Sequence, residues 1–469
     1  MKALLSGVDE TTRFRYNSWK QLYPHPTTLC KREAYKNMRF AIYTLGCKVN
    51  QYESQAMQTL LEQSGHRCVP FEEQADLYII NTCSVTAVSD KKSRQVIRRV
   101  RRGNPEAVIA VCGCYAQAEP EQVAALGVDL VSGTGQRLAF LEQCRQAVGQ
   151  RQSWVSVDDA LHRTGFEQLP AGGLEGRTRA MLKVQDGCRN FCTYCIIPYT
   201  RGALRSQPLE DAAGQAAELA QRGYREIVLT GIEIASWGEE WKNALSFIDL
   251  LEAVCHAAPG LRIRLGSLEP RVITEAFCQR AAKLDNLCPH FHLSLQSGCD
   301  TTLKRMNRRY DTARFLESCR LLRRYFDRPA ITTDLIVGFP GETEEEFSAT
   351  LDFLKKAGFA AMHIFPYSRR PGTPADKMPH QISNAEKESR AHRAAAVAKE
   401  LEADYLSSFV GQTLPVLFEE EKEGFWRGHA PNYGEVYVTS AENLHNRLAA
   451  VTVTGVEDSH MTGVLCQNV

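Results

Sequence analysis

Short apolar runs alternate with amphipathic segments from Met38 to about residue 150. We expect buried strands in three of these runs, MRFAIYTLGC, ADLYIINTC and AVIAVCGC. Between them, YESQAMQTLLEQSG has a helical period and ends at Gly65, and SDKKSRQVIRRVRRGNP predicts a basic helix that ends at Gly103 and Pro105. Because strands that alternate with helices are typical of a parallel sheet, residues 38–150 predict an α/β domain.

The same alternation returns in residues 177–408, which contain six β-rich runs: AMLKVQ, EIVLTGI, IRLGSLE, HFHLSLQ, ITTDLIVGF and AAMHIFPY. Six β/α units favour an incomplete TIM-like barrel over a small open sheet. The Ala- and Glu-rich segment 383–408 predicts one long helix. Residues 409–469 hold only short β runs, which predict a small all-β barrel at the end of the chain.

Two segments stand outside these domains. Residues 1–37 show no clear periodicity, and two interpretations stay open for them: a disordered leader, or an extension upstream of a natural start at Met38. Residues 151–176 are mixed in character and contain Ala-Gly-Gly, so we predict a linker between the α/β domain and the incomplete barrel.

The composition is ordinary for a globular protein. The net charge of +1 leaves any contact with nucleic acid to local patches. No apolar run is long enough to cross a bilayer, and the first residues lack the apolar stretch of a secretory signal. We therefore expect a cytoplasmic protein. In a reducing cytoplasm, its sixteen cysteines indicate metal binding or catalysis rather than disulfides.

Three cysteines are spaced as ligands of an iron–sulfur cluster. Cys188, Cys192 and Cys195 follow a predicted strand in the segment VQDGCRNFCTYCIIPYTRG, where Gly187 allows the backbone to turn. Three thiolates can hold three corners of a [4Fe-4S] cluster, which usually takes four cysteines. The missing fourth ligand would leave one iron open for chemistry.

Structural zinc is the alternative for this motif. Zinc sites usually combine two Cys-x2-4-Cys pairs into a tetrahedron. The next cysteine, Cys255, is distant and falls in a predicted helix. The spacing, together with the aromatic Tyr194 before the last cysteine, favours a cluster.

A second set of cysteines follows the three predicted strands of the first domain. Cys47, Cys83 and Cys114 each come just after one strand, and the carboxyl ends of parallel strands gather at one edge of a sheet. A single buried cysteine would be explained as a small hydrophobic residue. Three on successive strands favour a second cluster. Cys112 is one strand step from Cys114, so its side chain should face the core instead.

Around Cys188, Cys192 and Cys195 the chain resembles the radical S-adenosylmethionine superfamily. The segments LTGIE, LGSLEP, DLIVGFPGET and FPYSRRPGTPA occur in the order expected of it. The resemblance implies that the open iron chelates the amino and carboxylate groups of S-adenosylmethionine, whose cleavage yields a 5′-deoxyadenosyl radical. It also implies that the cofactor is bound by Tyr194 of the cysteine motif and by Gly231, Glu269 and Gly338 of these segments.

From Met38 to the C-terminus the chain resembles the methylthiotransferases, most clearly in the segments LGCKVNQYES, NTCSVT and GCYAQ. LGCKVN is most similar to the branch that acts on N6-threonylcarbamoyladenosine in tRNA; the branches that act on isopentenyladenosine or on a ribosomal protein usually carry other residues after the first cysteine. The resemblance implies two [4Fe-4S] clusters and two S-adenosylmethionine molecules per turnover. One would methylate a sulfur at the auxiliary cluster of Cys47, Cys83 and Cys114, and the other would supply the radical that removes hydrogen from C2 of the adenine.

Two regions favour RNA as the partner. The helix at 90–102 is crowded with cations that only Asp90 opposes, so phosphate contact is favoured over a merely solvated face; its cations are Lys91, Lys92, Arg94, Arg98, Arg99, Arg101 and Arg102. A smaller patch holds Arg305, Arg308 and Arg309. The terminal barrel resembles the TRAM RNA-binding module, with candidate contacts at Phe425, Trp426, Arg427, His429, Asn432 and Tyr433. We expect the tRNA anticodon stem-loop as the substrate.

The segment TGIEIASWG departs from the family pattern, because Glu233 stands where a neutral polar residue or His is common and Trp237 where Tyr is usual. Other activities also stay open: methylthiolation of isopentenyladenosine, a radical enzyme that acts on protein, or a non-catalytic, metal-containing RNA-binding protein. For the favoured activity we expect a monomer that uses an electron donor such as flavodoxin or ferredoxin, and a sulfur donor.

Overall fold

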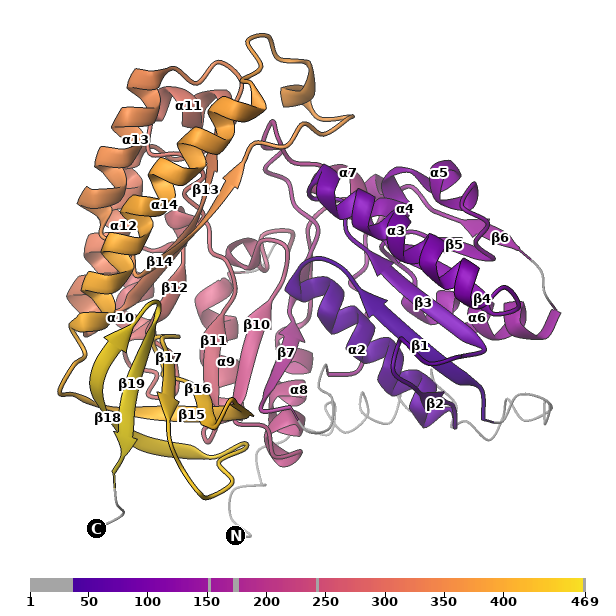
Figure 1. Ribbon diagram of the computed structural model, residues 1–469, viewed down its shortest axis with the longest axis horizontal. Coiled ribbons are helices and arrows are strands. Elements are labelled where there is room, and N and C mark those ends of the chain that lie inside the picture. The colour runs from indigo at the N-terminus through magenta and orange to yellow at the C-terminus, as the bar shows by residue number, and fades with distance from the viewer. Residues whose placement is uncertain (1–36, 151–152, 172–176, 242–243, 467–469) are drawn as a thin grey trace.

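The computed structural model describes residues 37–150, 153–171, 177–241 and 244–466. The predicted leader 1–37 therefore lies, apart from Asn37, outside the described residues. Figure 1 shows two large α/β parts side by side and a small barrel of strands packed below one of them.

The first part is a parallel sheet, as the alternating pattern predicts. Its strand order is β2-β1-β3-β4-β5-β6, and every neighbouring pair is parallel. The strands are β1 (Arg39–Thr44), β2 (Arg67–Cys68), β3 (Leu77–Thr82), β4 (Val108–Gly113), β5 (Leu130–Ser132) and β6 (Trp154–Ser156). The pattern did not predict the two- and three-residue strands β2, β5 and β6, which are too short to show an alternation. β6 lies within the segment 151–176 that was predicted as a linker.

Helices cover both faces of this sheet (Figure 1). One face packs against α2 (Lys48–Gln63) and α6 (Arg137–Gln150), and the other against α3 (Ala87–Gly103). Two short helices, α4 (Cys114–Ala118) and α5 (Pro120–Ala124), follow β4. Cys112 is fully buried in the layer of α2 and α6, so the prediction that it belongs to the core is confirmed.

The central part is the incomplete β/α barrel that six β-rich runs predicted. Its parallel strands form two sheets, β11-β10-β7 and β12-β13-β14, which isolated bridges at Ile263–Leu287 and Leu268–Leu293 connect. Their bounds are β7 (Arg179–Lys183), β10 (Glu226–Thr230), β11 (Arg262–Leu265), β12 (His290–His292), β13 (Ala330–Val337) and β14 (Ala361–Pro366). No pairing joins β7 to β14 among the described residues, and α2 of the first domain packs against β7 at this open side.

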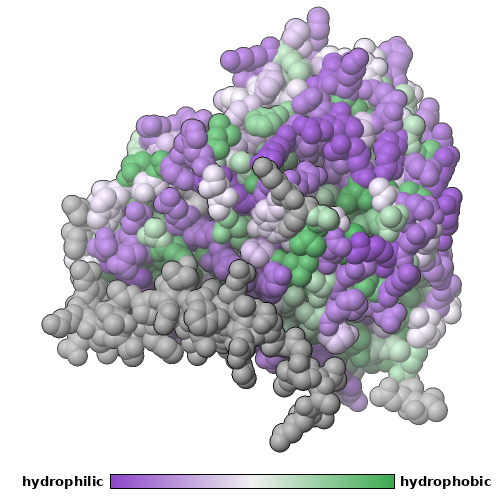
Figure 2. Space-filling view, turned by 180° about the vertical axis from the view of Figure 1, so that it is seen from behind, coloured by the Kyte–Doolittle hydropathy of each residue, from purple (hydrophilic) through white to green (hydrophobic). Residues whose placement is uncertain are grey.

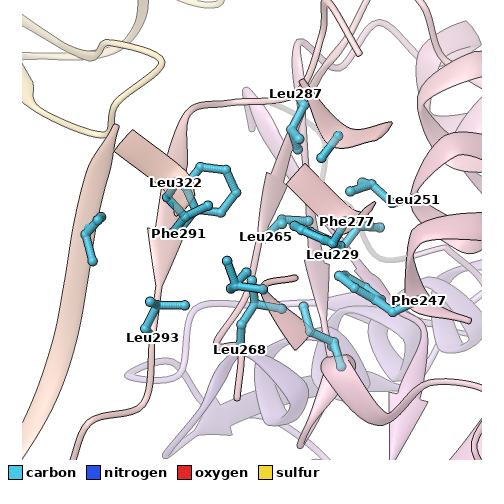
Figure 3. Packing of buried hydrophobic residues seen from close by; sticks show 14 of the residues in the cluster. Leu229, Phe247, Leu251, Leu265, Leu268, Phe277, Leu287, Phe291, Leu293 and Leu322 are labelled. Atoms are coloured by element: carbon cyan, nitrogen blue, oxygen red, sulfur yellow. The ribbon is translucent and has the colours of Figure 1, made fainter. Parts of the chain in front are cut away.

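A large apolar core lies between the barrel strands and the surrounding helices. Figure 3 shows side chains such as Leu229, Leu265 and Phe291 meeting residues of the helices, and the rings of Phe247 and Phe277 stack with centroids 6.3 Å apart. The helices of this layer are α8 (Leu209–Gln221), α9 (Phe247–Ala257), α10 (Glu275–Ala281), α11 (Asp300–Arg305), α12 (Thr312–Tyr325), α13 (Glu344–Ala357) and α14 (Asn384–Ser407).

The last part is a closed barrel with strand order β15-β16-β17-β19-β18. Its strands are β15 (Thr413–Lys422), β16 (Phe425–His429), β17 (Glu435–Val438), β18 (Leu448–Glu457) and β19 (His460–Leu465). Arg262 of β11 donates to the carbonyl of His429 at 3.0 Å, and Arg264 donates to that of Pro431 at 2.9 Å. The small barrel is thus fastened to the amino-terminal ends of the central strands.

The outer surface on the face of Figure 2 is mostly hydrophilic, with apolar residues scattered among the polar ones. Among the described residues, no helix combines the length and the apolar character needed to span a membrane.

A buried ionic cluster joins the first domain to the central one. Glu53 of α2 accepts from Arg201 at 2.8 Å, from Lys183 at 3.0 Å and from Arg137 at 2.9 Å. Asp186 completes the cluster by pairing with Lys183 at 2.7 Å. All five side chains are almost fully buried, so the charges are compensated within the protein, by one another and by the buried Arg205, which lies 3.5 Å from Asp186.

A second interdomain contact lies at the start of α3. Arg370 of the central domain forms an ion pair of 2.5 Å with Asp90 and also contacts the Ser84 hydroxyl. Asp90 is therefore not a surface acid among the cations of the basic helix, as the sequence pattern suggested. It is a buried partner of a residue 280 positions further along the chain.

Removal of the central carboxylate should destabilise the protein strongly. Glu53→Gln leaves Arg137 and part of the Arg201 and Lys183 charge uncompensated, so we expect a loss of about 3–5 kcal/mol in the free energy of unfolding. The matched control is Glu73→Gln, which removes an exposed pair with Arg39 and should cost at most about 1 kcal/mol. Urea unfolding followed by tryptophan fluorescence measures both, and equal small losses would contradict the account.

The same cluster predicts how stability depends on pH. Desolvation by burial would raise the pKa of Glu53, but Arg201, Lys183 and Arg137 together outweigh it and hold the pKa well below its ordinary value of 4.5. Because the folded-state pKa is lowered, the stabilisation is complete above the ordinary value and is lost as the pH falls through the folded-state value. The stability difference between the natural protein and Glu53→Gln should therefore narrow as the pH is lowered below 4.5, and a difference that widens there would refute this.

Candidate functional site

Three cysteines meet at one edge of the first sheet. Cys47 follows β1 and precedes α2, Cys83 follows β3, and Cys114 begins α4 directly after β4. The strands β1, β3 and β4 are direct neighbours and run parallel, so their carboxyl ends lie side by side. We name these three residues the sheet-edge cysteines.

Tight packing and mutual electrostatic effects place the sheet-edge thiols together. Gly46 has a φ of +104°, and a Cβ there would lie only 2.8 Å from the Cys83 sulfur. Burial raises the pKa of Cys114 to about 12; the Arg201 guanidinium opposes this rise, and the thiols of Cys83 and Cys47 add to it. The three sulfurs are therefore within electrostatic reach of one another and of one buried cation.

Cys188, Cys192 and Cys195, named here the loop cysteines, form a second compact group. The backbone N–H of Cys195 donates to the carbonyl of Cys192 at 2.9 Å. Gly187, with a φ of +74°, has no room for a Cβ because it would clash with the carbonyl of Ala203. Burial raises the pKa of Cys195 to about 12, and Cys192 and Cys188 add to the rise.

The segment after α11 holds the loop cysteines in place. Arg308 donates from Nη1 to the Cys192 sulfur at 3.1 Å, and Asn307 donates to the carbonyl of Phe191 at 3.0 Å. Within the predicted patch of Arg305, Arg308 and Arg309, Arg305 pairs with Glu346, and Arg308 is turned inward against the cysteine. Their separation of over a hundred residues from the cysteines gave the sequence no sign of this contact.

The donor sets fit iron–sulfur clusters. Each group offers three thiols, and thiolates are the usual ligands of such clusters, in which each cysteine binds a different iron. Among the described residues, no three His, Cys, Asp or Glu side chains converge closely enough to hold a single metal ion. The thiols in each group nevertheless influence one another's pKa, as expected of ligands spread around a larger group.

Two buried glutamates lie beside the loop cysteines. The backbone N–H of Glu269 donates to Glu233 Oε1 at 3.2 Å. Burial raises the pKa of Glu233 to about 7, with Arg308 opposing the rise and Glu269 adding to it. A small pocket here is lined by Asn190, Cys192, Glu269, Asn307, Arg308 and Arg309. Sequence reasoning noted Glu233 only as a departure from a family pattern, and the structure places it at the site.

Three other predicted cofactor residues have packing roles in the structure. A Cβ at Gly231 would lie 2.7 Å from Ile234, and one at Gly338 would clash with Lys387. Tyr194 packs against a cluster of Met306, Phe339, Tyr367 and Ala375. Their contacts with a cofactor stay predictions.

The basic helix α3 is only partly available to a partner. Arg94 donates to the Tyr115 hydroxyl at 3.1 Å, and Arg101 pairs with Asp129 at 2.5 Å. The exposed cations of the helix are Lys91, Lys92, Arg98, Arg99 and Arg102.

Of the six predicted RNA contacts on the terminal barrel, three are buried: Trp426, His429 and Asn432. Tyr433 stacks on His290 of β12 and on His429, with ring centroids 5.1 Å and 4.8 Å apart. Trp426 belongs to the barrel core, whereas Phe425 is 46% exposed. The aromatic residues were predicted to meet RNA because a sequence cannot show that this barrel docks against the central domain.

Comparison with known proteins agrees with this architecture. Residues 39–133 match the family described as uncharacterized protein family UPF0004, and residues 182–354 match the radical SAM superfamily. The chain is 42% identical to the threonylcarbamoyladenosine tRNA methylthiotransferase MtaB of Bacillus subtilis, over 88% of this chain and 93% of the relative. The chain belongs to the radical SAM methylthiotransferase family.

Relatives named for more than one activity occur in this family. The Thermotoga maritima MtaB is 36% identical over 90% of this chain and 95% of its own. A tRNA-2-methylthio-N(6)-dimethylallyladenosine synthase of Pelotomaculum thermopropionicum is 34% identical over 92% of this chain and 98% of its own. Among solved structures, the radical S-adenosylmethionine methyltransferase TsrM of Kitasatospora setae has a similar fold, with a TM-score of 0.53 and 16% identity over 72% of this chain and 77% of that chain.

A short helix links the two cysteine groups in this family member. Helix α7 (Ile197–Arg201) begins two residues after Cys195, and its last residue, Arg201, is the cation that faces Cys114 and Cys47. The carbonyl of Thr200 in α7 accepts a hydrogen bond of 2.5 Å from Thr134 of the first domain. The loop cysteines and the sheet-edge cysteines are thus tied together by one rigid element.

Removal of either cysteine group should halve the iron content of the protein. We expect anaerobically purified protein with Ala at Cys47, Cys83 and Cys114 to keep about half of the iron, because the loop cysteines still hold one cluster. The matched control is Cys112→Ala, which removes a buried thiol two residues from Cys114 and should keep all of it. Colorimetric iron analysis measures this, and full retention of iron in the triple variant would show that the sheet-edge cysteines hold no cluster.

Proposed function

We propose that this protein adds a methylthio group to C2 of N6-threonylcarbamoyladenosine next to the anticodon in tRNA. The observation that carries the proposal is the presence of two separate three-thiol sites in one chain, joined by α7. The identity to relatives named for threonylcarbamoyladenosine, 42% for the first, supports this nucleoside over dimethylallyladenosine, for which the relatives reach 34–36%.

Each cysteine group would hold one [4Fe-4S] cluster with three protein ligands. The sheet-edge cysteines Cys47, Cys83 and Cys114 hold the auxiliary cluster, and the loop cysteines Cys188, Cys192 and Cys195 hold the one that binds S-adenosylmethionine. When bound, the latter supplies the electron that cleaves S-adenosylmethionine and so provides a radical strong enough to remove a C2 hydrogen, which is not acidic. Tyr194, Gly231, Glu269 and Gly338 are the proposed contacts of the cofactor.

The chain's own residues position the reacting groups. Arg308 fixes the orientation of Cys192, and Arg201 places a positive charge beside Cys114. Glu233 and Glu269 line the same site as buried acids, suited to a positively charged group such as the ammonium of an amino acid. Such preorganised groups act without further reorganisation when the substrate arrives.

The exposed cations of α3, with Lys91, Lys92 and Arg98 at its start and middle, would contact tRNA phosphates. Phe425 is exposed and would stack on an unpaired base. The anticodon loop suits such a surface because its bases are unpaired and can be turned outward. The reaction also requires an electron donor, such as flavodoxin or ferredoxin, and a sulfur donor, and we propose that it takes place in the cytoplasm with the protein as a monomer.

Mass spectrometry of nucleosides tests the proposal directly. In tRNA from a strain that lacks the gene, we expect 2-methylthio-N6-threonylcarbamoyladenosine to disappear and its unthiolated form to accumulate. The natural gene should restore it, and a gene with Cys195→Ala should not, whereas one with Cys319→Ala, which alters a core thiol, should. Loss of the isopentenyl form instead would move the protein to the sister activity, and unchanged tRNA would reject both.

A further inference from the structure

Lys48 of the first domain is exposed and lies at the open side of the central barrel. It is the first residue of α2, directly after Cys47, and its side chain is within electrostatic reach of Tyr433, Arg264, Arg179 and Glu226. Because successive residues of a strand face opposite sides, and Ile227 and Ile263 lie in the core beneath the helices, Glu226 and Arg264 face the barrel interior. Lys48 therefore lies near the interior face of the barrel, at the open side where α2 packs against β7.

The neighbouring cations already have carboxylate partners. Arg264 pairs with Glu226 at 2.7 Å, and Arg179 pairs with Glu419 at 2.6 Å. Lys183, which lies on the same face of β7 as Arg179, pairs with Glu53 at 3.0 Å. Lys48, in contrast, forms no hydrogen bond or ion pair with any residue in the described part of the chain.

The other edge of the open side presents exposed rings. His363 and Phe365 of β14 are exposed, and the His363 ring lies 6.2 Å from that of His292 on β12. His292 in turn lies 3.4 Å from Asp334. The two elements at the open side of the barrel, α2 and β14, thus carry an exposed lysine without a side-chain partner and exposed ring faces on which a base can stack.

On the basis of the proposed function, we propose that Lys48 binds the carboxylate of the threonylcarbamoyl group on the substrate nucleoside. That group ends in a carboxylate, whereas the isopentenyl group of the sister substrate is an uncharged hydrocarbon. The carboxylate of the threonylcarbamoyl group can pair with the Lys48 ammonium. The isopentenyl group would remove water from that ammonium without offering a partner, so Lys48 favours the first nucleoside and disfavours the second. Because Lys48 adjoins Cys47, the same contact brings the base to the sheet-edge cysteines.

The test compares three anticodon stem-loop RNAs that differ at one nucleoside. The first carries N6-threonylcarbamoyladenosine, the second its threoninol analogue with CH2OH in place of the carboxylate, and the third isopentenyladenosine. Fluorescence anisotropy measures their affinity for the full-length, iron-loaded protein under anaerobic conditions. We expect the carboxylate RNA to bind roughly 10- to 100-fold more tightly than the threoninol RNA, as for a hydrogen bond to a charged group.

The variants assign this preference to one side chain. Lys48→Gln should bind the carboxylate and threoninol RNAs equally, at the affinity of the natural protein for the threoninol RNA, and Lys48→Arg should keep part of the preference. Lys91→Gln is the matched control on the same domain, and it should weaken all three RNAs by the same factor because phosphate contacts carry no nucleoside information.

Two results would overturn the proposal: equal affinity of the natural protein for the carboxylate and threoninol RNAs, or a preference that survives Lys48→Gln. The first measurement needs no variant and stays decisive if Lys48→Gln fails to fold. If the natural protein shows no preference for the carboxylate RNA but deletion of its gene abolishes the methylthio nucleoside, only the proposed role of Lys48 is refuted. Absence of the preference together with unchanged tRNA would refute the proposed function as well.

Discussion

The buried carboxylate of Glu53 is the constraint on which the arrangement of the site depends. It belongs to the first domain, yet its partners Arg201 and Lys183 belong to the central one. This cluster fixes α2 against β7 and α7, and Cys47 and Cys195 lie just before the first residues of α2 and α7. The charges are costly to bury, and they are tolerated because each is compensated by a neighbour within about hydrogen-bonding distance.

Arg201 has a double role in this arrangement. Its guanidinium donates to Glu53 and Asn50 at 2.8 Å and 2.7 Å, which fixes its position, and it also acts on the thiols of Cys114 and Cys47. A cation beside thiolates stabilises their charged form, which is the form that binds iron. The same residue therefore joins the domains and prepares the sheet-edge cysteines for a cluster. Arg308 has the equivalent place beside Cys192 at the other group.

The sequence could predict those features that depend on local pattern or on chain order. The parallel sheet, the six barrel strands and the long helix α14 follow from periodicity, and the sheet-edge cysteines follow from the rule that parallel strands end at one edge. Features created by contacts between distant segments could not be predicted. Arg308 and Glu233 reach the loop cysteines through contacts between distant segments of the central domain, and Asp90 pairs with Arg370 across two domains. Tyr433 stacks on His290 only because the terminal barrel docks on β12.

The central claim is that this chain holds two iron–sulfur clusters and that only three protein side chains bind each of them. An anaerobic crystal structure with anomalous scattering measured at the iron edge tests it most directly. The account predicts two four-iron groups, one contacted only by Cys47, Cys83 and Cys114 and the other only by Cys188, Cys192 and Cys195. A fourth protein side chain on either group, or a single zinc ion in place of one, would contradict it.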